Sequence, residues 1–278
     1  MNIGIVGLGL IGGSMAKSIK AKTDHNVFGY DLSSDVLAMA QMSGAVNGIL
    51  NPDTLRSCDL LLLAVRPGAA VLWTEEHGSE IPGSCIVIDL CGVKRAVVEK
   101  LKPLSERYGF RYLGGHPMAG KEVAGFANAS AHLYEGASMI LTPDETTDLP
   151  LLEKVRDFFY SIGFTKLTFC TPEEHDRIIA YTSQLAHITS SAYVKSPESQ
   201  EQFGFSAGSF RDMTRVARLD ENMWTELFLD NDDYLLKQVD ILIDNLQKYQ
   251  KALKEKDAET LRALLREGRE MKESAGGR

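Results

Sequence analysis

The chain has 278 residues, 44% of them hydrophobic, which is enough to fill one large core or two ordinary ones. Its formal net charge of −8 argues against nonspecific binding to nucleic acid or to an anionic membrane surface. No apolar run approaches the length of about eighteen residues that crosses a bilayer, and the N-terminal residues read as a strand rather than as a signal peptide. Four cysteines without C-x-x-C spacing indicate free thiols in a reducing compartment. We therefore expect a soluble, cytoplasmic protein.

The first predicted strand, residues 2–7, runs into a glycine-rich turn that opens a helix, Gly7-Leu8-Gly9-Leu10-Ile11-Gly12. In dinucleotide sites the first glycine makes a tight turn, the second lets a pyrophosphate approach the backbone and the third lets helix and strand pack closely. The second predicted strand, 26–30, is followed by Asp31, 19 positions past Gly12, and an acid about 20 positions on binds the ribose hydroxyls. Because this carboxylate would repel a 2′-phosphate, the sequence predicts NAD rather than NADP.

Strand and helix patterns continue to alternate up to about residue 170. The remaining predicted strands are 59–65, 85–89, 110–114, 136–142 and 165–169, and the predicted helices are 11–21, 34–43, 68–78, 94–107 and 149–161. This alternation predicts an α/β domain over residues 1–170, a Rossmann-like doubly wound sheet. Ligands of such sheets bind beyond the carboxyl ends of the strands, where Val65 and Arg66 join the glycine turn and Asp31 as expected cofactor contacts.

A second glycine-rich segment follows the predicted strand 110–114 and carries His116. We expect a loop here that leaves space around the imidazole, the side chain best suited to accept a proton near pH 7. His25, His77 and His132 lie in polar contexts and receive no role. No histidines show metal-ligand spacing, so no metal site is expected.

From residue 171 onward the sequence reads as helices only. Thr171, Pro172 and Glu174 form a predicted helix start with a capping box. An apolar stripe follows over 222–250, and a last helix is expected over about 257–273. These patterns predict an all-α domain over residues 171–278. Its long apolar stripes favour association of subunits, although internal packing would account for them equally.

The second domain also concentrates positive charge. Ser209 is expected to cap a helix on which Arg211, Arg215 and Arg218 share one face at i, i+4 and i+7. A solvated cationic stripe is one interpretation, and carboxylate binding by the guanidinium groups is the other. His187, on the first helix of this domain, is a core or interface residue or a ligand contact.

Together these segments resemble the prephenate/arogenate dehydrogenase family over nearly the whole chain. The resemblance is carried by Gly7–Gly12, Asp31, Gly114–Glu122, Tyr134–Pro143, Ser183–His187 and Gly208–Arg215. It implies an NAD domain followed by a helical dimerisation domain, and hence a homodimer. It also implies the NAD-dependent oxidative decarboxylation of prephenate to 4-hydroxyphenylpyruvate in tyrosine biosynthesis. Arogenate dehydrogenase, which gives tyrosine directly, is the alternative within the family.

The resemblance further implies roles for individual residues. His116 corresponds to the catalytic histidine that engages the ring hydroxyl, and Arg215 to the arginine that binds a substrate carboxylate. Lys121 and Glu122 border the site, and His187 corresponds to a histidine near the substrate side chain. The expected substrate-binding residues are therefore Arg215, His187, Arg211, Lys121 and Gln184.

Two positions depart from the family pattern. Gly92 stands where a serine would support the catalytic histidine, so a water or a backbone group is expected to take its place. Gln184 stands where the family helix often carries a histidine, which bears on selectivity for the substrate side chain. Outside the family, the rivals are another two-domain NAD-dependent dehydrogenase or imine reductase and, among non-enzymes, an NAD-sensing regulator. The acidic balance does not suggest the basic DNA-reading surface of such a regulator.

Overall fold

The structure, a computed structural model, describes residues 1–275. The chain forms two compact units, Met1–Asn231 and Asp232–Arg278. The first unit contains an eight-stranded sheet and ten α-helices among the residues described, and the second contains a pair of long helices.

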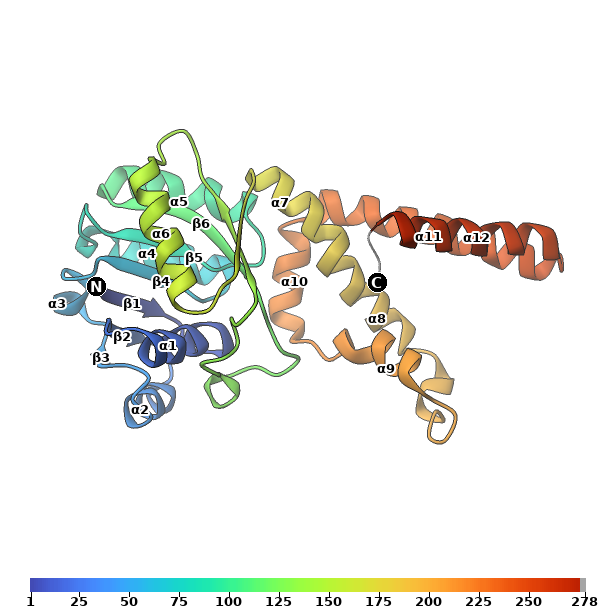
Figure 1. The fold of residues 1–278 in the computed structure, drawn as a ribbon, viewed down its shortest axis with the longest axis horizontal. Coiled ribbons are helices and arrows are strands. Elements are labelled where there is room, and N and C mark those ends of the chain that lie inside the picture. The colour runs from blue at the N-terminus through green and yellow to red at the C-terminus, as the bar shows by residue number, and fades with distance from the viewer. Residues whose placement is uncertain (276–278) are drawn as a thin grey trace. The chain divides into compact units, whose positions relative to one another are not determined.

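The sheet has the order β3-β2-β1-β4-β5-β6-β7-β8 (Figure 1). Its strands are β1 (Asn2–Val6), β2 (Asn26–Tyr30), β3 (Gly48–Ile49), β4 (Leu60–Leu63), β5 (Ile86–Asp89), β6 (Arg111–Met118), β7 (Ser138–Thr142) and β8 (Lys166–Phe169). All neighbours are parallel except β6 and β7. The chain order reverses between β1 and β4, which is the switch point where ligands of doubly wound sheets bind. The predicted α/β fold is therefore confirmed.

Helices cover both faces of this sheet (Figure 1). They are α1 (Leu10–Lys22), α2 (Ser34–Met42), α3 (Pro52–Leu55), α4 (Pro67–His77), α5 (Arg95–Tyr108) and α6 (Leu149–Ser161). Successive leucines of β4 alternate between two cores: Leu60 and Leu62 pack on the side of α1 and α6, and Leu61 and Leu63 on the side of α4 and α5. The all-apolar run is thus a strand buried on both faces, as its sequence indicates.

The sequence missed the short elements β3 and α3, whose two and four residues carry no readable period. It also ended the strand that precedes His116 too early. β6 continues to Met118 and pairs antiparallel with β7, with His116 opposite Ile140. Position 115 within this strand requires glycine, because a Cβ there would lie 2.6 Å from the Met139 side chain and 2.9 Å from the Asp89 carbonyl oxygen. Close packing, not a loop, explains this glycine.

Helices complete the first unit after β8. They are α7 (Pro172–Ile179), α8 (Leu185–Tyr193), α9 (Gly208–Thr214) and α10 (Glu221–Leu229), with a π-helical turn at Ala180–Gln184 between α7 and α8. The predicted start of α7 is confirmed, because the Thr171 side chain accepts from the Glu174 N–H in a capping box.

The predicted cap and arginine face of α9 are wrong. The helix begins at Gly208 after Ala207, which provides no side-chain cap, and it ends at Thr214. A 3-10 turn follows at Arg215–Ala217, and Arg218 has extended backbone. Arg211, Arg215 and Arg218 therefore do not share one α-helical face.

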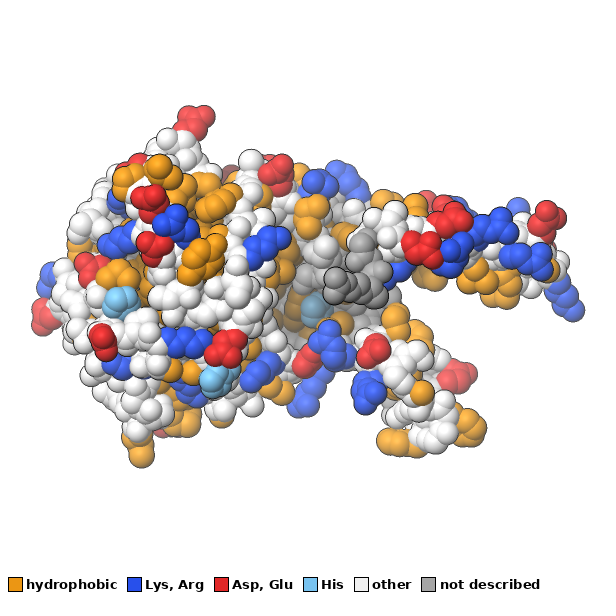
Figure 2. Space-filling view, in the orientation of Figure 1, with side chains coloured by type: hydrophobic (Ala, Val, Ile, Leu, Met, Phe, Trp, Pro, Cys, Tyr) orange, Lys and Arg blue, Asp and Glu red, His pale blue; other side chains and the backbone are white. Residues whose placement is uncertain are grey.

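The second unit consists of α11 (Asp232–Lys254) and α12 (Ala258–Ser274). The stripe predicted over 222–250 is split, because α10 ends before Asp230 and α11 begins at Asp232. Several large apolar side chains stay exposed between charged ones along this pair (Figure 2): Leu236, Ile241, Ile243, Leu246, Leu253, Leu265 and Met271. Of the helices in residues 1–275, none combines the length and the apolar character needed to cross a membrane.

Candidate active site

The glycine turn between β1 and α1 has the geometry of a phosphate cradle. Gly7 has φ of 86°, and a Cβ at Gly12 would lie 1.9 Å from the Gly7 carbonyl oxygen. Both positions therefore require glycine. A Cβ at Gly9 would meet no atom within 4 Å, so the backbone is open there. α1 begins directly afterwards without a side-chain cap, which leaves its first N–H groups available to an anion.

Asp31 closes one side of this turn. One of its carboxylate oxygens accepts from the Leu8 N–H at 2.8 Å and the other from the Ser33 N–H at 2.9 Å. Leu8 itself is buried in the core, so only its backbone reaches the turn. Val65 also borders the turn, since its side chain lies 2.4 Å from where a Gly7 Cβ would be.

The other expected cofactor contacts differ in exposure. Leu10 and Ile11 begin α1 and are partly exposed. Arg66 precedes α4 and is exposed, with its guanidinium 4.0 Å from the Glu226 carboxylate on α10. The same carboxylate accepts from the Gly68 N–H at 2.7 Å, so α10 packs beside the start of α4.

His116 lies beyond the carboxyl end of β5, since the last residue of that strand, Asp89, pairs with Gly114. This is the edge where ligands of an open α/β sheet bind. The imidazole is partly exposed, and its Nδ1 lies 2.9 Å from Nε2 of His175 on α7. His175 is buried, and its Nδ1 lies 2.7 Å from a carboxylate oxygen of Asp176.

His116 has a neighbour that the sequence analysis did not expect, the side chain of His175. The water or backbone group expected in place of the serine missing at Gly92 stays a prediction. Sequence reasoning missed His175 and Asp176, although both lie in the first turns of the well-predicted helix α7. The sequence shows two adjacent polar residues near the start of this helix, but it does not show that they are buried or that His175 contacts β6, because both depend on tertiary packing.

Asp176 is anchored to the start of α5. Its carboxylate accepts from the backbone N–H of Lys94 at 2.8 Å and of Arg95 at 2.9 Å. The Arg95 Nε–H donates to it as well, at 3.3 Å. Burial opposes ionisation of Asp176, but the hydrogen bonds from His175 and from these N–H groups outweigh it, and its pKa is lowered.

A second buried polar cluster lies next to this chain of side chains. Lys94 is fully buried and donates to Asp89, which also accepts from the Tyr112 hydroxyl at 2.7 Å. Burial, then the nearby carboxylate of Asp89, holds the Tyr112 pKa well above its usual range.

Both coupled histidines have lowered pKa values. Burial holds the pKa of His116 well below 6.5, and the neighbouring His175 ring and the Lys94 ammonium lower it further. Burial also lowers the pKa of His175, although the hydrogen bond to Asp176 opposes the shift. Both imidazoles are therefore neutral at pH 7, and His116 is in the form that accepts a proton.

Four further side chains form two pairs in this part of the chain. The Arg215 guanidinium forms an ion pair with the Glu122 carboxylate, and both side chains are substantially exposed. His187 on α8 stacks on Trp224 of α10, with ring centroids 3.8 Å apart and planes at 29°. Burial lowers the pKa of His187, and the positive charge of Arg215 lowers it further. His187 and Trp224 line a pocket of about 260 Å³ together with Lys195.

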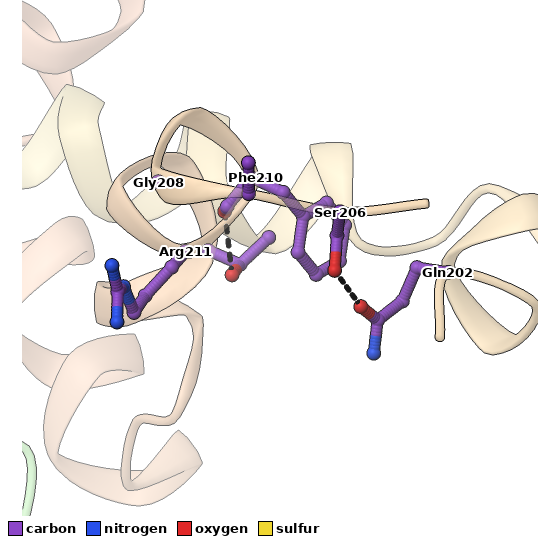
Figure 3. A pocket seen from close by; sticks show the side chains of 7 residues that line it. Gln202, Ser206, Gly208, Phe210 and Arg211 are labelled. Carbon is purple, nitrogen blue, oxygen red and sulfur yellow. Dashed lines mark hydrogen bonds between the residues drawn. The ribbon is translucent and has the colours of Figure 1, made fainter. Parts of the chain in front are cut away.

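The remaining expected substrate contacts lie elsewhere. Arg211 lines a separate pocket of about 380 Å³ with Gln202, Ser206 and Phe210 (Figure 3). The Lys121 ammonium donates to the Asn128 carbonyl at 3.2 Å.

Gln184 is turned to the interior. It is 2% exposed, and its amide donates to the Leu227 carbonyl at 2.8 Å and accepts from the Asn231 amide at 2.7 Å. This placement gives Gln184 a structural part, joining the π-helical turn to α10, instead of the expected substrate contact. Within residues 1–275 no three His, Cys, Asp or Glu side chains are grouped to hold a metal ion.

Comparison with known proteins gives concordant matches. Residues 15–166 match the family model described as prephenate dehydrogenase, nucleotide-binding domain, and residues 171–267 match prephenate dehydrogenase, dimerization domain. A prephenate dehydrogenase of Bacillus subtilis is 30% identical over 267 residues, which cover 92% of this chain and 71% of that protein. A cyclohexadienyl dehydrogenase of Zymomonas mobilis is 30% identical over 269 residues, covering 94% and 91%.

A solved structure is similar over nearly its whole length. The prephenate dehydrogenase of A. aeolicus, in complex with hydroxyphenyl propionate and NAD+, superimposes with a TM-score of 0.86 at 27% identity. The match covers 99% of this chain and 98% of that one.

Proposed function

This chain belongs to the prephenate dehydrogenase family, and we propose that it catalyses the NAD-dependent oxidative decarboxylation of prephenate to 4-hydroxyphenylpyruvate, a step of tyrosine biosynthesis. The observation that carries the proposal is His116, a neutral imidazole at the ligand-binding edge of a dinucleotide-binding sheet. The complex of the A. aeolicus relative with NAD+ and a hydroxyphenyl acid supports the same assignment.

The proposed NAD site is the turn from Gly7 to Gly12. The backbone of Gly9 and the uncapped first N–H groups of α1 would hold the pyrophosphate, and Asp31 would accept from the ribose hydroxyls. Val65 and Arg66 would border the nicotinamide half. When bound, NAD+ supplies a hydride acceptor for the carbinol carbon of the substrate.

His116 is the proposed catalytic base. Its unprotonated Nε2 would accept the proton of the substrate hydroxyl while the carbinol carbon is oxidised. Loss of the ring carboxylate as carbon dioxide then makes the ring aromatic, so the reaction is effectively irreversible. General base catalysis of this kind contributes about 10²–10⁴-fold to the rate.

Arg215 is the proposed ligand of a substrate carboxylate. Its guanidinium already holds a carboxylate, that of Glu122, which a substrate carboxylate would replace. His187, stacked on Trp224, would contact the substrate side chain, and the charges of Lys121 and Arg211 would attract the anionic substrate from outside this contact. Fixing the substrate in this way stabilises the transition state mainly through orientation.

Arogenate is a second candidate substrate, and one observation favours it. The Nδ1 of His187 lies 2.9 Å from the Ser183 carbonyl oxygen, which can only accept. Nδ1 therefore carries the hydrogen, and Nε2 of this neutral ring is an acceptor. An acceptor suits the ammonium group of arogenate better than the keto oxygen of prephenate.

A parallel assay of prephenate and arogenate with NAD+ and NADP+ tests the proposal. Reduced coenzyme and released carbon dioxide are expected in a ratio of one to one, with NAD+ preferred. Reduced coenzyme without carbon dioxide would instead assign the chain to another class of dehydrogenase.

We also propose a homodimer formed through the helical domain, residues 171–278. The match to a dimerization-domain family and the exposed apolar side chains of α11 and α12 support it. Light scattering at micromolar concentration should give twice the monomer mass. The four free cysteines fit a reducing compartment, and we propose the cytoplasm.

A further inference from the structure

We propose that His175 and Asp176 are positioning residues of the reaction, which together fix the ring orientation and the tautomer of His116. The inference rests on the proposed function, because it assigns His116 the part of the base.

The geometry is a continuous line of three side chains. The Asp176 carboxylate lies 2.7 Å from Nδ1 of His175, and Nε2 of His175 lies 2.9 Å from Nδ1 of His116. Only the outer ring, His116, keeps part of its surface exposed, while the other two are buried. Two contacts of this length at both nitrogens of His175 leave it little freedom to rotate.

The carboxylate sets the direction of both hydrogen bonds. Asp176 already accepts from the backbone N–H groups of Lys94 and Arg95, so it is ionised and can only accept. Nδ1 of His175 must therefore carry a hydrogen, and its Nε2 must accept. His116 then donates from Nδ1, which leaves the lone pair on its Nε2 for the substrate.

The line is also anchored from behind. The Asp176 backbone carbonyl accepts from the Asn231 amide at 2.9 Å, and the Asn231 oxygen accepts from Arg95 at 3.0 Å. The start of α5 and the end of the α10 segment thus both hold the first turns of α7. An anchored carboxylate behind a histidine is the arrangement that fixes tautomers in catalytic triads and metal sites.

Gly92 cannot make this contact, because it has no side chain. The position of its missing Cβ is 3.4 Å from the Leu227 side chain. Gly92 therefore offers no hydroxyl group. In this structure the acceptor for Nδ1 of His116 is Nε2 of His175 on α7.

A purely structural part for the pair is the competing explanation, since Asp176 also joins α5 to α7. The two explanations differ for Asp176→Asn. An asparagine whose NH2 group faces His175 would donate to Nδ1 and reverse both hydrogen bonds, so that His116 would carry its proton on Nε2. The wrong tautomer lowers kcat by about 10⁴-fold in a catalytic triad, and we expect a loss of about 10²–10⁴-fold here, with KM for substrate and for NAD+ changed by less than about threefold.

His175 allows a matched pair of variants. His175→Gln keeps an oxygen near the position of Nε2 and should retain most of the activity. His175→Leu removes the acceptor at similar volume and should lose about 10–100-fold in kcat, the usual effect of removing a group behind a functional histidine. His132→Asn, an exposed histidine bonded to Glu135, is the control and should leave kcat unchanged. Equal kcat in the glutamine and leucine variants would overturn the proposal.

A measurement without turnover separates this inference from the proposed function. Two-bond ¹H–¹⁵N spectra of histidine-labelled protein report the tautomer of each ring, and His116→Asn assigns the His116 signals. We expect His116 to be protonated on Nδ1 in the wild type and to lose this preference in His175→Leu. Protonation on Nε2 in the wild type would refute the inference, even if prephenate is oxidised. If neither substrate is oxidised but the tautomer is as expected, the proposed function fails and the positioning stands.

Discussion

Replacement of His116 separates its chemical part from its structural part. His116→Asn keeps an N–H that can donate to the buried Nε2 of His175, whereas His116→Ala leaves that acceptor without a partner. A buried unsatisfied acceptor costs about 1–3 kcal/mol. The alanine variant should therefore be less stable than the asparagine variant by about this amount in urea denaturation.

Neither variant retains a base at the sheet edge. Both should lose about 10²–10⁴-fold in kcat, which corresponds to about 3–5 kcal/mol of transition-state stabilisation. Initial rates are followed by the absorbance of the reduced coenzyme, and NAD+ affinity is followed by fluorescence titration. The affinity should stay within about twofold, because the glycine turn and Asp31 are untouched. Unchanged turnover in the asparagine variant would remove His116 from the chemistry and refute the reasoning.

Three further predictions concern the carboxylate ligand, the pH dependence and the glycine turn. Arg215→Ala should raise KM for prephenate by roughly 10- to 150-fold, the loss of one charge-assisted contact, while Arg218→Ala should not; equal KM values in the two variants would place Arg215 outside the site. The pKa values of the two coupled histidines are lowered on folding, so the unfolded chain binds more protons below about pH 6.5. The free energy of unfolding should therefore decrease as the pH is lowered from 7 to 5. A free energy of unfolding that stays constant over this range would contradict the neutral state of both rings. Gly9→Ala should weaken NAD+ binding at unchanged thermal stability, whereas Gly12→Ala should lower the melting temperature as well, because only the second Cβ meets backbone atoms; equal melting temperatures would be inconsistent with this geometry.

Local patterns were sufficient for much of the fold. The glycine turn, the two-sided burial of β4 and the capped start of α7 all follow from residues within about one turn or strand of each other. These features identify the sheet, its ligand-binding edge and the transition to helices.

The errors arose where distant segments decide the structure. β6 runs through Gly114 and Gly115 because β7 and Asp89 leave no room for side chains there. The arginines of 211–218 fall on different backbone segments because α9 ends at Thr214. His175 was missed for the same reason, since its contact with His116 joins residues 59 positions apart.

Gln184 shows how a local reading misjudges a side chain. The sequence placed it one turn from His187 and so near the substrate. The π-helical turn and the amide of Asn231 instead place it in the interior. A polar residue on a helix can therefore be assigned to a binding site only when the segments that pack against that helix are known, because they can satisfy its hydrogen bonds in the interior.

A crystal structure with NAD+ and 4-hydroxyphenylpyruvate would test the central claim most directly, that His116 accepts a proton from the ring hydroxyl while Arg215 holds a carboxylate. We expect Nε2 of His116 about 2.6–3.2 Å from the phenolic oxygen and Nδ1 still bonded to His175, with the product carboxylate paired to Arg215. A product ring whose hydroxyl lies away from His116, or a carboxylate bound without Arg215, would contradict the account.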